Sequence, residues 1–216
     1  MQYDVISFDI FDTLLTRGVL RPDDLFELMR QKVKTMFSLD VDFIKLRKEA
    51  EWEVNKKKGA YTNIHDIYEE FENVAGVSRE VAQQIKQLEI DLEYNLILPR
   101  CDMRDIFNSL IAAGKHVILV SDMYLTSDII KGLLKKCGYE ECAEMWVSCE
   151  CGLRKDQDTI WNPVLEKYEG KRFIHVGDNS RSDWQTLVDR RKEAYWVMSA
   201  ATEWKLSPYY DRFRAY

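Results

Sequence analysis

The chain has 216 residues, of which 46% are hydrophobic and 31% are charged, with only four Pro and nine Gly. This composition is that of an ordered globular protein and excludes a fibrous or disordered chain. The formal net charge of -6 disfavours sequence-independent binding of nucleic acid, because such binding needs a basic face that displaces counterions. The length fits one catalytic domain with an insert, since typical domains have about 100 to 200 residues.

The sequence predicts neither a membrane segment nor a disulfide framework. No run of about 18 consecutive apolar residues occurs, and the start MQYDVISFDI lacks the basic flank and long apolar stretch of a signal peptide. We therefore expect a cytoplasmic protein without membrane insertion. Five cysteines, an odd number, favour reduced thiols. Because Cys137, Cys142, Cys149 and Cys151 cluster in the sequence, a zinc site stays open as an alternative, although their spacing matches no paired C-x-x-C motif.

The first predicted element is a buried parallel strand at residues 3–8, where an apolar run ends at Asp9. From residue 21 to residue 99 the pattern changes to helices, and no strand-like run interrupts it. Gly76 separates two of these helices, and Ser78 is placed to cap the second. We expect a small helical bundle that docks against the sheet. Its apolar stripes are Leu25, Met29, Val33 and Met36, then Ile64, Ile67, Tyr68 and Phe71, and then Val81, Ile85, Leu88 and Leu92.

After residue 100 the pattern alternates between helices and short apolar strands. This alternation is typical of an α/β fold with a parallel sheet. We therefore predict a core domain of residues 1–20 and 100–216 and an inserted helical domain of residues 21–99. The predicted helices are residues 105–113, 156–168 and 182–190, and the predicted strands are residues 116–120, 173–176 and 194–198.

Polar residues directly follow the predicted strands. Ligands bind outside the carboxyl ends of parallel strands, so these residues are the first candidates for chemistry. Each one alone is explained as a turn or cap residue, but together they occur where one sheet would gather them. The candidates are Asp9, Phe11, Asp12 and Thr13 in FDIFDTLL, Ser121 and Asp122 in SDMY, Lys155 in GLRKD, and Asp178, Asn179 and Asp183 in GDNSRSD.

These residue types suit phosphoryl transfer, in which the charge of the transferred group must be neutralised. Asp9 is able to attack phosphorus and form an aspartyl phosphate. Magnesium prefers oxygen ligands, and Asp9 and Asp178 offer two carboxylates from different strands. Ser121 and Lys155 would hold the phosphoryl oxygens. Asp183 would orient Lys155 or a metal-bound water.

The segments FDIFDTLL, VILVSDMY, GLRKDQDTIW and FIHVGDNSRSD resemble the four ordered motifs of the haloacid dehalogenase (HAD) superfamily. The resemblance implies a three-layer, Rossmann-like core with a parallel sheet, and a helical C1-type cap inserted after the first motif, where residues 21–99 lie. It implies an aspartyl-enzyme intermediate, Mg2+ as cofactor and a small phosphorylated substrate. By this resemblance the catalytic residues are Asp9, Ser121, Lys155 and Asp183, the substrate contacts are Thr13, Ser121, Asp122, Lys155 and Asn179, and the metal ligands are Asp9, the carbonyl of Phe11, and Asp178.

The match breaks at Phe11. The family's phosphatases have an Asp at this position, which protonates the leaving oxygen and later activates water. General acid-base catalysis contributes roughly a hundredfold to ten-thousandfold in rate, so an alkyl phosphate would be a poor substrate. Asp12 is a candidate replacement, although alternation along a strand end directs its side chain elsewhere.

Three functions therefore stay open. The first is a magnesium-dependent phosphohydrolase acting on a metabolite with a good leaving group, such as an acyl phosphate or a phosphoanhydride. The second is a 2-haloacid dehalogenase, because those relatives have an aromatic residue where this chain has Phe11. The third is a module that binds a phosphorylated ligand without turnover. FDIFDTLLTR is also similar to hydrolase segments beside glycosyltransferases of bacterial surface polysaccharides, which implies association with such a module.

Outside these motifs, other conspicuous residues have less defined roles. We expect His116 and His175, on predicted strands, to be packing residues rather than ligands. We also expect Trp146, Trp161, Trp184 and Trp196 to be buried. Trp52 and His65 are candidates for substrate contact from the helical domain, because a cap closes over the site and supplies specificity.

Overall fold

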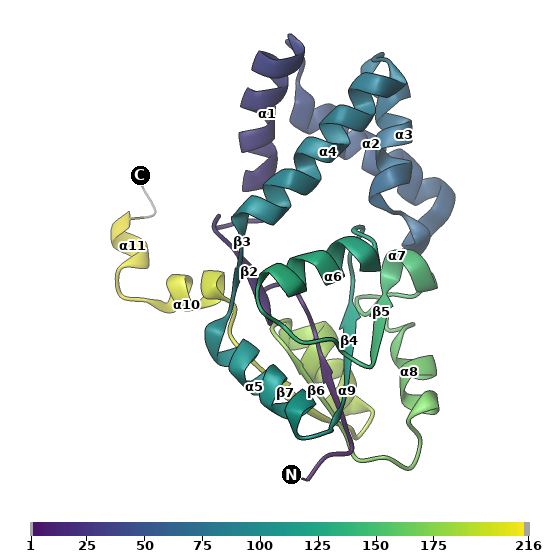
Figure 1. Cartoon of the computed structure of the whole chain (residues 1–216), viewed down its shortest axis with the longest axis vertical. Helices are drawn as coiled ribbons and strands as arrows, with labels where there is room; N and C mark the ends of the chain where they lie inside the picture. The colour runs from purple at the N-terminus through teal and green to yellow at the C-terminus, as the bar shows by residue number, and fades with distance from the viewer. Residues whose placement is uncertain (1, 214–216) are drawn as a thin grey trace.

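The computed structural model describes residues 2–213, which form an α/β protein around a five-stranded parallel sheet (Figure 1). The predicted fold class is confirmed. Adjacent strands of the order β5-β4-β1-β6-β7 pair in parallel throughout. The strands are β1 (Val5–Phe8), β4 (His116–Ser121), β5 (Glu144–Val147), β6 (Phe173–Gly177) and β7 (Glu193–Trp196).

Strand β1 lies at the centre of the sheet, and all four of its residues are buried. Val5 pairs with His116 on one side and with Phe173 on the other, so β4 and β6 run in register with β1. The carboxyl ends of these three strands consequently lie at one edge of the sheet. Asp9, Ser121 and Asp178 lie at or directly after those ends.

Helices cover both faces of the sheet. On one face, α5 (Cys101–Ala112) and α6 (Ser127–Lys136) pack Phe107 and Leu133 against β1 and β4. On the other face, α8 (Trp161–Lys167) and α9 (Thr186–Asp189) enclose a second apolar cluster that includes Trp161 and Leu187. The remaining helical segments of this region are α7 (Ser148–Cys151), the π-helical turn η2 (Ser180–Gln185), α10 (Ala200–Leu206) and α11 (Tyr210–Phe213).

A helical insert leaves the sheet through a small antiparallel pair, β2 (Leu15–Arg17) and β3 (Ile97–Pro99). We define the insert as α1 (Asp24–Phe37), α2 (Phe43–Lys58), η1 (Gly59–Tyr61), α3 (Ile64–Ala75) and α4 (Arg79–Leu96). The expectation that no strand occurs between residues 21 and 99 is wrong, because β3 lies there. A three-residue strand has no periodicity of its own and forms here by pairing with β2.

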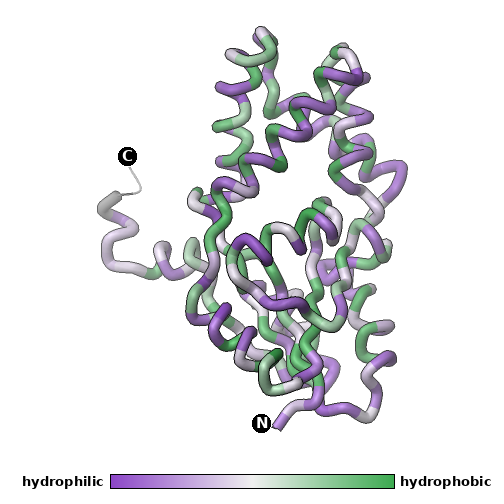
Figure 2. Tube along the Cα trace, viewed as in Figure 1, coloured by the Kyte–Doolittle hydropathy of each residue, from purple (hydrophilic) through white to green (hydrophobic). Residues whose placement is uncertain are grey.

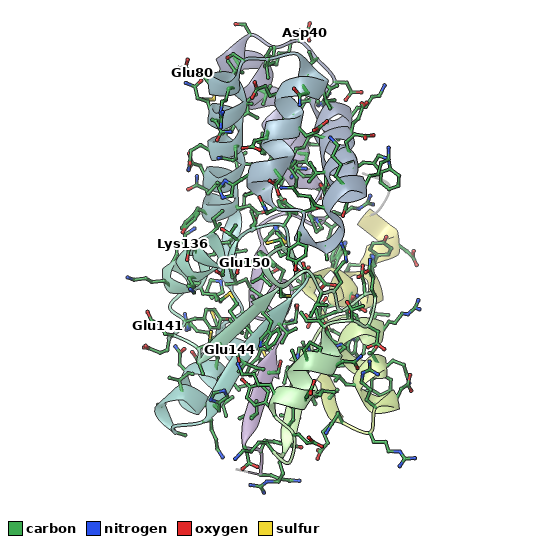
Figure 3. The ribbon with its side chains drawn as sticks, turned by 90° about the vertical axis from the view of Figure 1, so that its right-hand side faces the viewer. Asp40, Glu80, Lys136, Glu141, Glu144 and Glu150 are labelled. Atoms are coloured by element: carbon green, nitrogen blue, oxygen red, sulfur yellow. The ribbon has the colours of Figure 1, made fainter. Side chains whose placement is uncertain are left out.

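The insert stacks on the carboxyl side of the sheet along the long axis of the molecule, with Asp40 and Glu80 at its far end (Figure 3). Hydrophobic residues concentrate in the central strands, and hydrophobic and hydrophilic residues alternate along the insert helices (Figure 2). Leu25, Met29 and Val33 are buried as predicted, whereas Met36 is 63% exposed because α1 ends one residue later. Within residues 2–213, no helix has the length and apolar character needed to cross a membrane.

The other differences from the predicted elements occur where tertiary contacts decide. Strand β5 has only one fully buried residue, so no apolar run marks it in the sequence. Helix α8 begins at Trp161 rather than at Asp156, because the preceding loop turns back on itself with Asp158 at φ 58°. Trp161 is fully buried as expected, whereas Trp184 and Trp196 are 38% and 40% exposed, so the expectation of burial is wrong for these two.

Candidate active site

The structure brings together the residues that follow β1, β4 and β6. They line a cavity of about 430 Å3 between the sheet and the helical insert. Lys155 reaches the same cavity from the loop after α7. The cavity residues that the sequence predicted are Asp9, Phe11, Asp12, Ser121, Asp122, Lys155, Asp178, Asn179 and Asp183.

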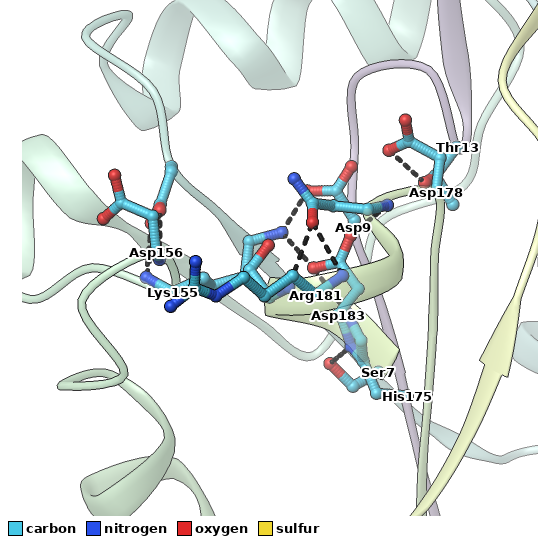
Figure 4. A network of polar contacts seen from close by, with 12 residues as sticks. Ser7, Asp9, Thr13, Lys155, Asp156, His175, Asp178, Arg181 and Asp183 are labelled. Atoms are coloured by element: carbon cyan, nitrogen blue, oxygen red, sulfur yellow. Dashed lines mark hydrogen bonds and ion pairs between the residues drawn. The ribbon is translucent and has the colours of Figure 1, made fainter. Parts of the chain in front are cut away.

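Lys155 is the cation at the centre of the site (Figure 4). Its buried Nζ donates to Asp9 Oδ1 at 2.5 Å and to Asp183 Oδ1 at 2.7 Å. Burial disfavours the charged ammonium, but the two carboxylates outweigh this effect and hold the pKa of Lys155 above its ordinary value. The lysine is therefore charged at neutral pH.

Asp183 is held from three sides. Its Oδ1 contacts Lys155 and lies 3.3 Å from His175 Nε2, and its Oδ2 accepts the backbone N–H of Asn179 at 3.0 Å. Burial raises the pKa of Asp183, but Lys155 and the other donors lower it further, so the net pKa is below the ordinary value. His175 is fully buried and also contacts Ser7 Oγ at 2.8 Å. His175 is thus more than a packing residue, because it supports Asp183 from beneath.

Three carboxylates form a potential metal site. Asp9, Asp178 and Asp183 each offer one oxygen, and these oxygens all lie within 4.8 Å of one another. Burial, together with Asp183 and Asp178, raises the pKa of Asp9 to about 7 despite its contact with Lys155. Burial and the nearby Asp12 raise the pKa of Asp178 to about 6. One ammonium cannot balance these carboxylates, so the site has the excess negative charge that a divalent cation would neutralise.

Asp12 also faces the cavity, which corrects the expectation from strand alternation. Its backbone has φ 62°, so the chain turns after Phe11 instead of continuing the strand. Arg100 Nη1 donates to the Asp12 carbonyl at 2.9 Å, and the Asp12 N–H donates to Leu15 O at 2.6 Å. These bonds hold the turn and place a fourth carboxylate in the cavity.

Comparison with known proteins rests on structure, since no protein-family model and no curated protein matches the sequence. The 2-haloacid dehalogenase of Pseudomonas syringae has a TM-score of 0.62 at 14% identity, over 90% of this chain and 86% of that chain. A HAD family enzyme of Bacteroides thetaiotaomicron was solved as a variant with magnesium and inorganic phosphate. It has a TM-score of 0.62 at 11% identity, over 92% of this chain and 95% of that chain. The magnesium-bound HAD-hydrolase YfnB of Bacillus subtilis has a TM-score of 0.59 at 14% identity, over 91% of this chain and 89% of that chain.

The chain has the Rossmann-like core fold of these HAD structures. In this HAD-like core, two predicted substrate contacts already have structural partners. Asp122 accepts the backbone N–H groups of Lys155 at 2.8 Å and of Asp156 at 3.0 Å, so it positions the Lys155 loop. Asn179 Oδ1 caps the turn η2 by accepting two backbone N–H groups. A substrate contact by either residue stays a prediction.

Thr13 lies beneath the site rather than on the cavity surface. Its side chain is buried, and Oγ1 donates to Asp178 Oδ1 at 3.4 Å. Thr13 therefore orients a carboxylate of the potential metal site, and its predicted contact with substrate would require a change in this arrangement.

The cysteines do not form a metal site. Within residues 2–213, only Asp9, Asp178 and Asp183 gather ligand atoms closely enough for one ion. Cys149 and Cys151 instead donate to the carbonyls of Leu125 and Leu153. The zinc alternative is therefore wrong.

Cavity residues that the sequence did not single out come from β2, from the helical insert and from the loops after β4 and α7. Trp52 and His65 were the predicted contacts, but neither lines this cavity, and Trp52 borders a smaller neighbouring one. The residues missed are Arg17, Asp23, Phe26, Glu51, Glu93, Tyr124 and Arg154. Arg17, Tyr124 and Arg154 lie in the quoted motif segments but hold no motif role, and the other four lie in the insert region. Whether these side chains face the cavity depends on how the insert folds over the sheet.

Proposed function

We propose that the chain is a magnesium-dependent phosphohydrolase that forms an aspartyl phosphate at Asp9. The observation that carries this proposal is the contact of Lys155 with both Asp9 and Asp183 beside the Asp178 carboxylate. A nucleophile, a fixed cation and a group of acidic ligands in one cavity are the parts that phosphoryl transfer needs. The phosphate and magnesium in the Bacteroides thetaiotaomicron structure are consistent with this chemistry on the same fold.

The residues present fit a magnesium ion. Asp9 and Asp178 would hold it, together with the Phe11 carbonyl, which accepts no hydrogen bond from the described residues. Bound magnesium would offset the negative charge of the phosphoryl group and of the carboxylates around it. Asp183 already binds Lys155 and the Asn179 N–H, so we assign it to support rather than to direct coordination.

The chain's own groups would then carry out two displacements. Asp9 attacks phosphorus, and the bond between phosphorus and the leaving oxygen breaks. Lys155 and the Ser121 hydroxyl stabilise the phosphoryl oxygens. Water then attacks the aspartyl phosphate and releases inorganic phosphate, which restores Asp9. Asp12 is the candidate base for this second step, because its carboxylate lines the cavity.

Phe11 restricts the leaving group. Its side chain lines the cavity where the resembling phosphatases have an acid, and a phenyl ring donates no proton. With Asp12 assigned only to the second displacement, the proposed substrate contains a leaving group that departs without protonation. Acyl phosphates and phosphoanhydrides meet this requirement, whereas alkyl phosphates do not.

Dehalogenation is the second candidate, and Phe11 and the similarity to a dehalogenase favour it. A 2-haloacid is itself a carboxylate, however, and the cavity presents Asp9, Asp12, Asp178 and Asp183 against Lys155 as the nearest cation. Without a divalent cation, the part of the cavity next to Asp9 repels an anionic substrate, because Lys155 is already paired with two of these carboxylates. Phosphoryl transfer with magnesium accounts better for the carboxylate at position 178.

The experiment measures phosphate release from acetyl phosphate with magnesium and with excess chelator. We expect release that needs the metal and that Asp9→Asn reduces to the uncatalysed level. The matched control is Asp128→Asn, which removes an exposed carboxylate on α6. Phosphate release that persists in Asp9→Asn or in chelator would contradict the proposal.

Two further measurements separate the alternatives. Chloride release from 2-chloropropionate in chelator would identify a dehalogenase. Trapping with beryllium fluoride and magnesium, without turnover of any phosphate ester or anhydride, would identify a binding module.

We further propose that the helical insert, residues 21–99, is a cap domain over the core of residues 1–20 and 100–216. The contacts that bridge the units include the Arg17–Glu93 ion pair, the Ile64 N–H that donates to the Tyr124 carbonyl at 2.8 Å, and the Tyr61 ring that lies against Gly152. An alanine Cβ at Gly152 would come within 2.3 Å of that ring. Association with a glycosyltransferase module and a cytoplasmic location remain predictions from the sequence.

A further inference from the structure

Arg17 lies at the side of the cavity that Phe11 lines. Its guanidinium carbon is 4.5 Å from the centroid of the Phe11 ring, a distance typical of a cation-π contact. Both side chains border the cavity that contains Asp9. A fixed cation therefore accompanies the aromatic residue at the position where a general acid is missing.

Glu93 holds Arg17 by one edge only. The Glu93 carboxylate accepts from Nε at 2.9 Å and from Nη2 at 3.0 Å, and both side chains are largely buried. None of the described residues accepts a hydrogen bond from Nη1. Nη1 is not fully buried, so it is open to the cavity rather than enclosed. Arg17 is thus oriented by protein and keeps two N–H donors for a ligand.

The other cavity arginine is a weaker candidate. Arg154 pairs with Asp156, and both side chains are substantially exposed, at 30% and 52%. Solvent screens such a pair and leaves its geometry less defined. The Arg17 and Glu93 side chains are only 8% and 2% exposed, so solvent screens this pair far less.

We infer that Arg17 receives the leaving group as an oxyanion and thereby selects phosphoric anhydrides as substrates. The inference rests on the proposed phosphohydrolase function. The leaving group is a carboxylate if the substrate is an acyl phosphate, or a phosphate if it is a phosphoanhydride. Both are oxygen anions that a guanidinium binds through N–H donors.

The transfer of the phosphoryl group to Asp9 needs no general acid. Asp9 forms a bond to phosphorus, and the electron pair of the breaking bond goes to the leaving oxygen, which Arg17 stabilises as its charge develops. For acetyl phosphate dianion, the sum with water is acetate and dihydrogen phosphate. An alcohol leaving group would instead need a proton that neither Phe11 nor Arg17 supplies, and Asp12 is assigned to the second displacement.

The test uses the full chain with magnesium and compares acetyl phosphate, ADP and glucose 6-phosphate. Because Arg17→Gln alone would leave the Glu93 carboxylate buried without its partner, the main variant is the double substitution Arg17→Gln/Glu93→Gln. Arg17→Lys keeps a cation without the planar fork. Arg30→Gln, which removes an exposed arginine of α1, is the control. Beryllium fluoride with magnesium serves as a probe that mimics the phosphoryl group without a leaving group.

We expect the double variant to lower kcat/KM for the anhydride substrate about tenfold to hundredfold, the effect of losing a charged hydrogen bond. Affinity for beryllium fluoride should change less than about twofold, because that complex lacks a leaving group. Arg17→Lys should restore part of the rate. A loss on acetyl phosphate assigns a carboxylate leaving group, and a loss on ADP assigns a phosphate.

Unchanged hydrolysis in the double variant would overturn the inference, as would a parallel loss of beryllium fluoride binding, which would make Arg17 a structural residue. A wild-type chain that prefers glucose 6-phosphate to both anhydrides would overturn it while leaving the phosphohydrolase proposal intact. A wild-type chain that neither hydrolyses any of the three nor traps beryllium fluoride would instead refute the proposed function itself.

Discussion

Replacing Lys155 by Met removes the cation that Asp9 and Asp183 share. The Lys155 and Asp183 side chains are 5% and 1% exposed, so Met would fill the space but leave two carboxylates facing each other out of water. Loss of one member of a buried ion pair costs about 3–5 kcal/mol. The two lost bonds, at 2.5 Å and 2.7 Å, suggest a similar range of about 3–6 kcal/mol, since a hydrogen bond to a charged group contributes ~1.5–3 kcal/mol.

Urea denaturation of the metal-free protein at pH 8 measures this loss as a lower midpoint with an unchanged slope. Lys34→Met, at a side chain that is 63% exposed on α1, is the control. The pKa of Asp9 is already raised to about 7, above its unfolded value, so the charged carboxylate costs stability above pH 7 and protonation relieves that cost as pH falls. We therefore expect a smaller loss at pH 5 than at pH 8. A loss below about 1 kcal/mol at pH 8, equal to that of the control, would refute the reasoning.

Three further predictions concern the same site. Gly177→Ala places a Cβ 2.4 Å from the Asp183 carboxyl carbon, so we expect destabilisation of about 1–3 kcal/mol by thermal unfolding and reduced phosphate release; a neutral effect would contradict this contact. Magnesium affinity, measured by calorimetry, should rise with pH from 5 to about 7.5, because protons on Asp9 and Asp178, with pKa values of about 7 and 6, compete with the metal; a flat profile would exclude them as ligands. Asn tolerates the backbone angle φ 62° of Asp12, so Asp12→Asn should keep the turn. We expect it to slow the second displacement roughly a hundredfold or more, while the aspartyl phosphate still forms in a burst. A change under about threefold would show that Asp12 serves only the turn and not catalysis.

Much of the core was predictable because its signals are local. The buried strands β1, β4 and β6 are short apolar runs, and each is followed directly by polar residues. Parallel strands in register end at one edge, so locating the runs also located Asp9, Ser121 and Asp178. The Ser78 cap was likewise readable, since capping depends on a side chain three residues from its partner, here the Val81 N–H.

The features that escaped prediction depend on partners distant in sequence. Strand β3 exists because β2 pairs with it, and β5 is a partly exposed edge strand without an apolar run. The direction of the Asp12 side chain follows from a backbone turn that Arg100 holds from 88 residues away. No periodicity encodes such a contact.

The sequence by itself determined the α/β class, the order of the central strands along the chain and the acidic residues at their ends, because each of these depends on burial patterns within a few residues. Only the tertiary structure decided which side chains face the cavity together. Arg17 and Glu93 are 76 residues apart and meet because the helical insert returns to the sheet beside its starting point. The pairing of the groups that would select a leaving group is therefore a property of the folded chain and not of any local sequence pattern.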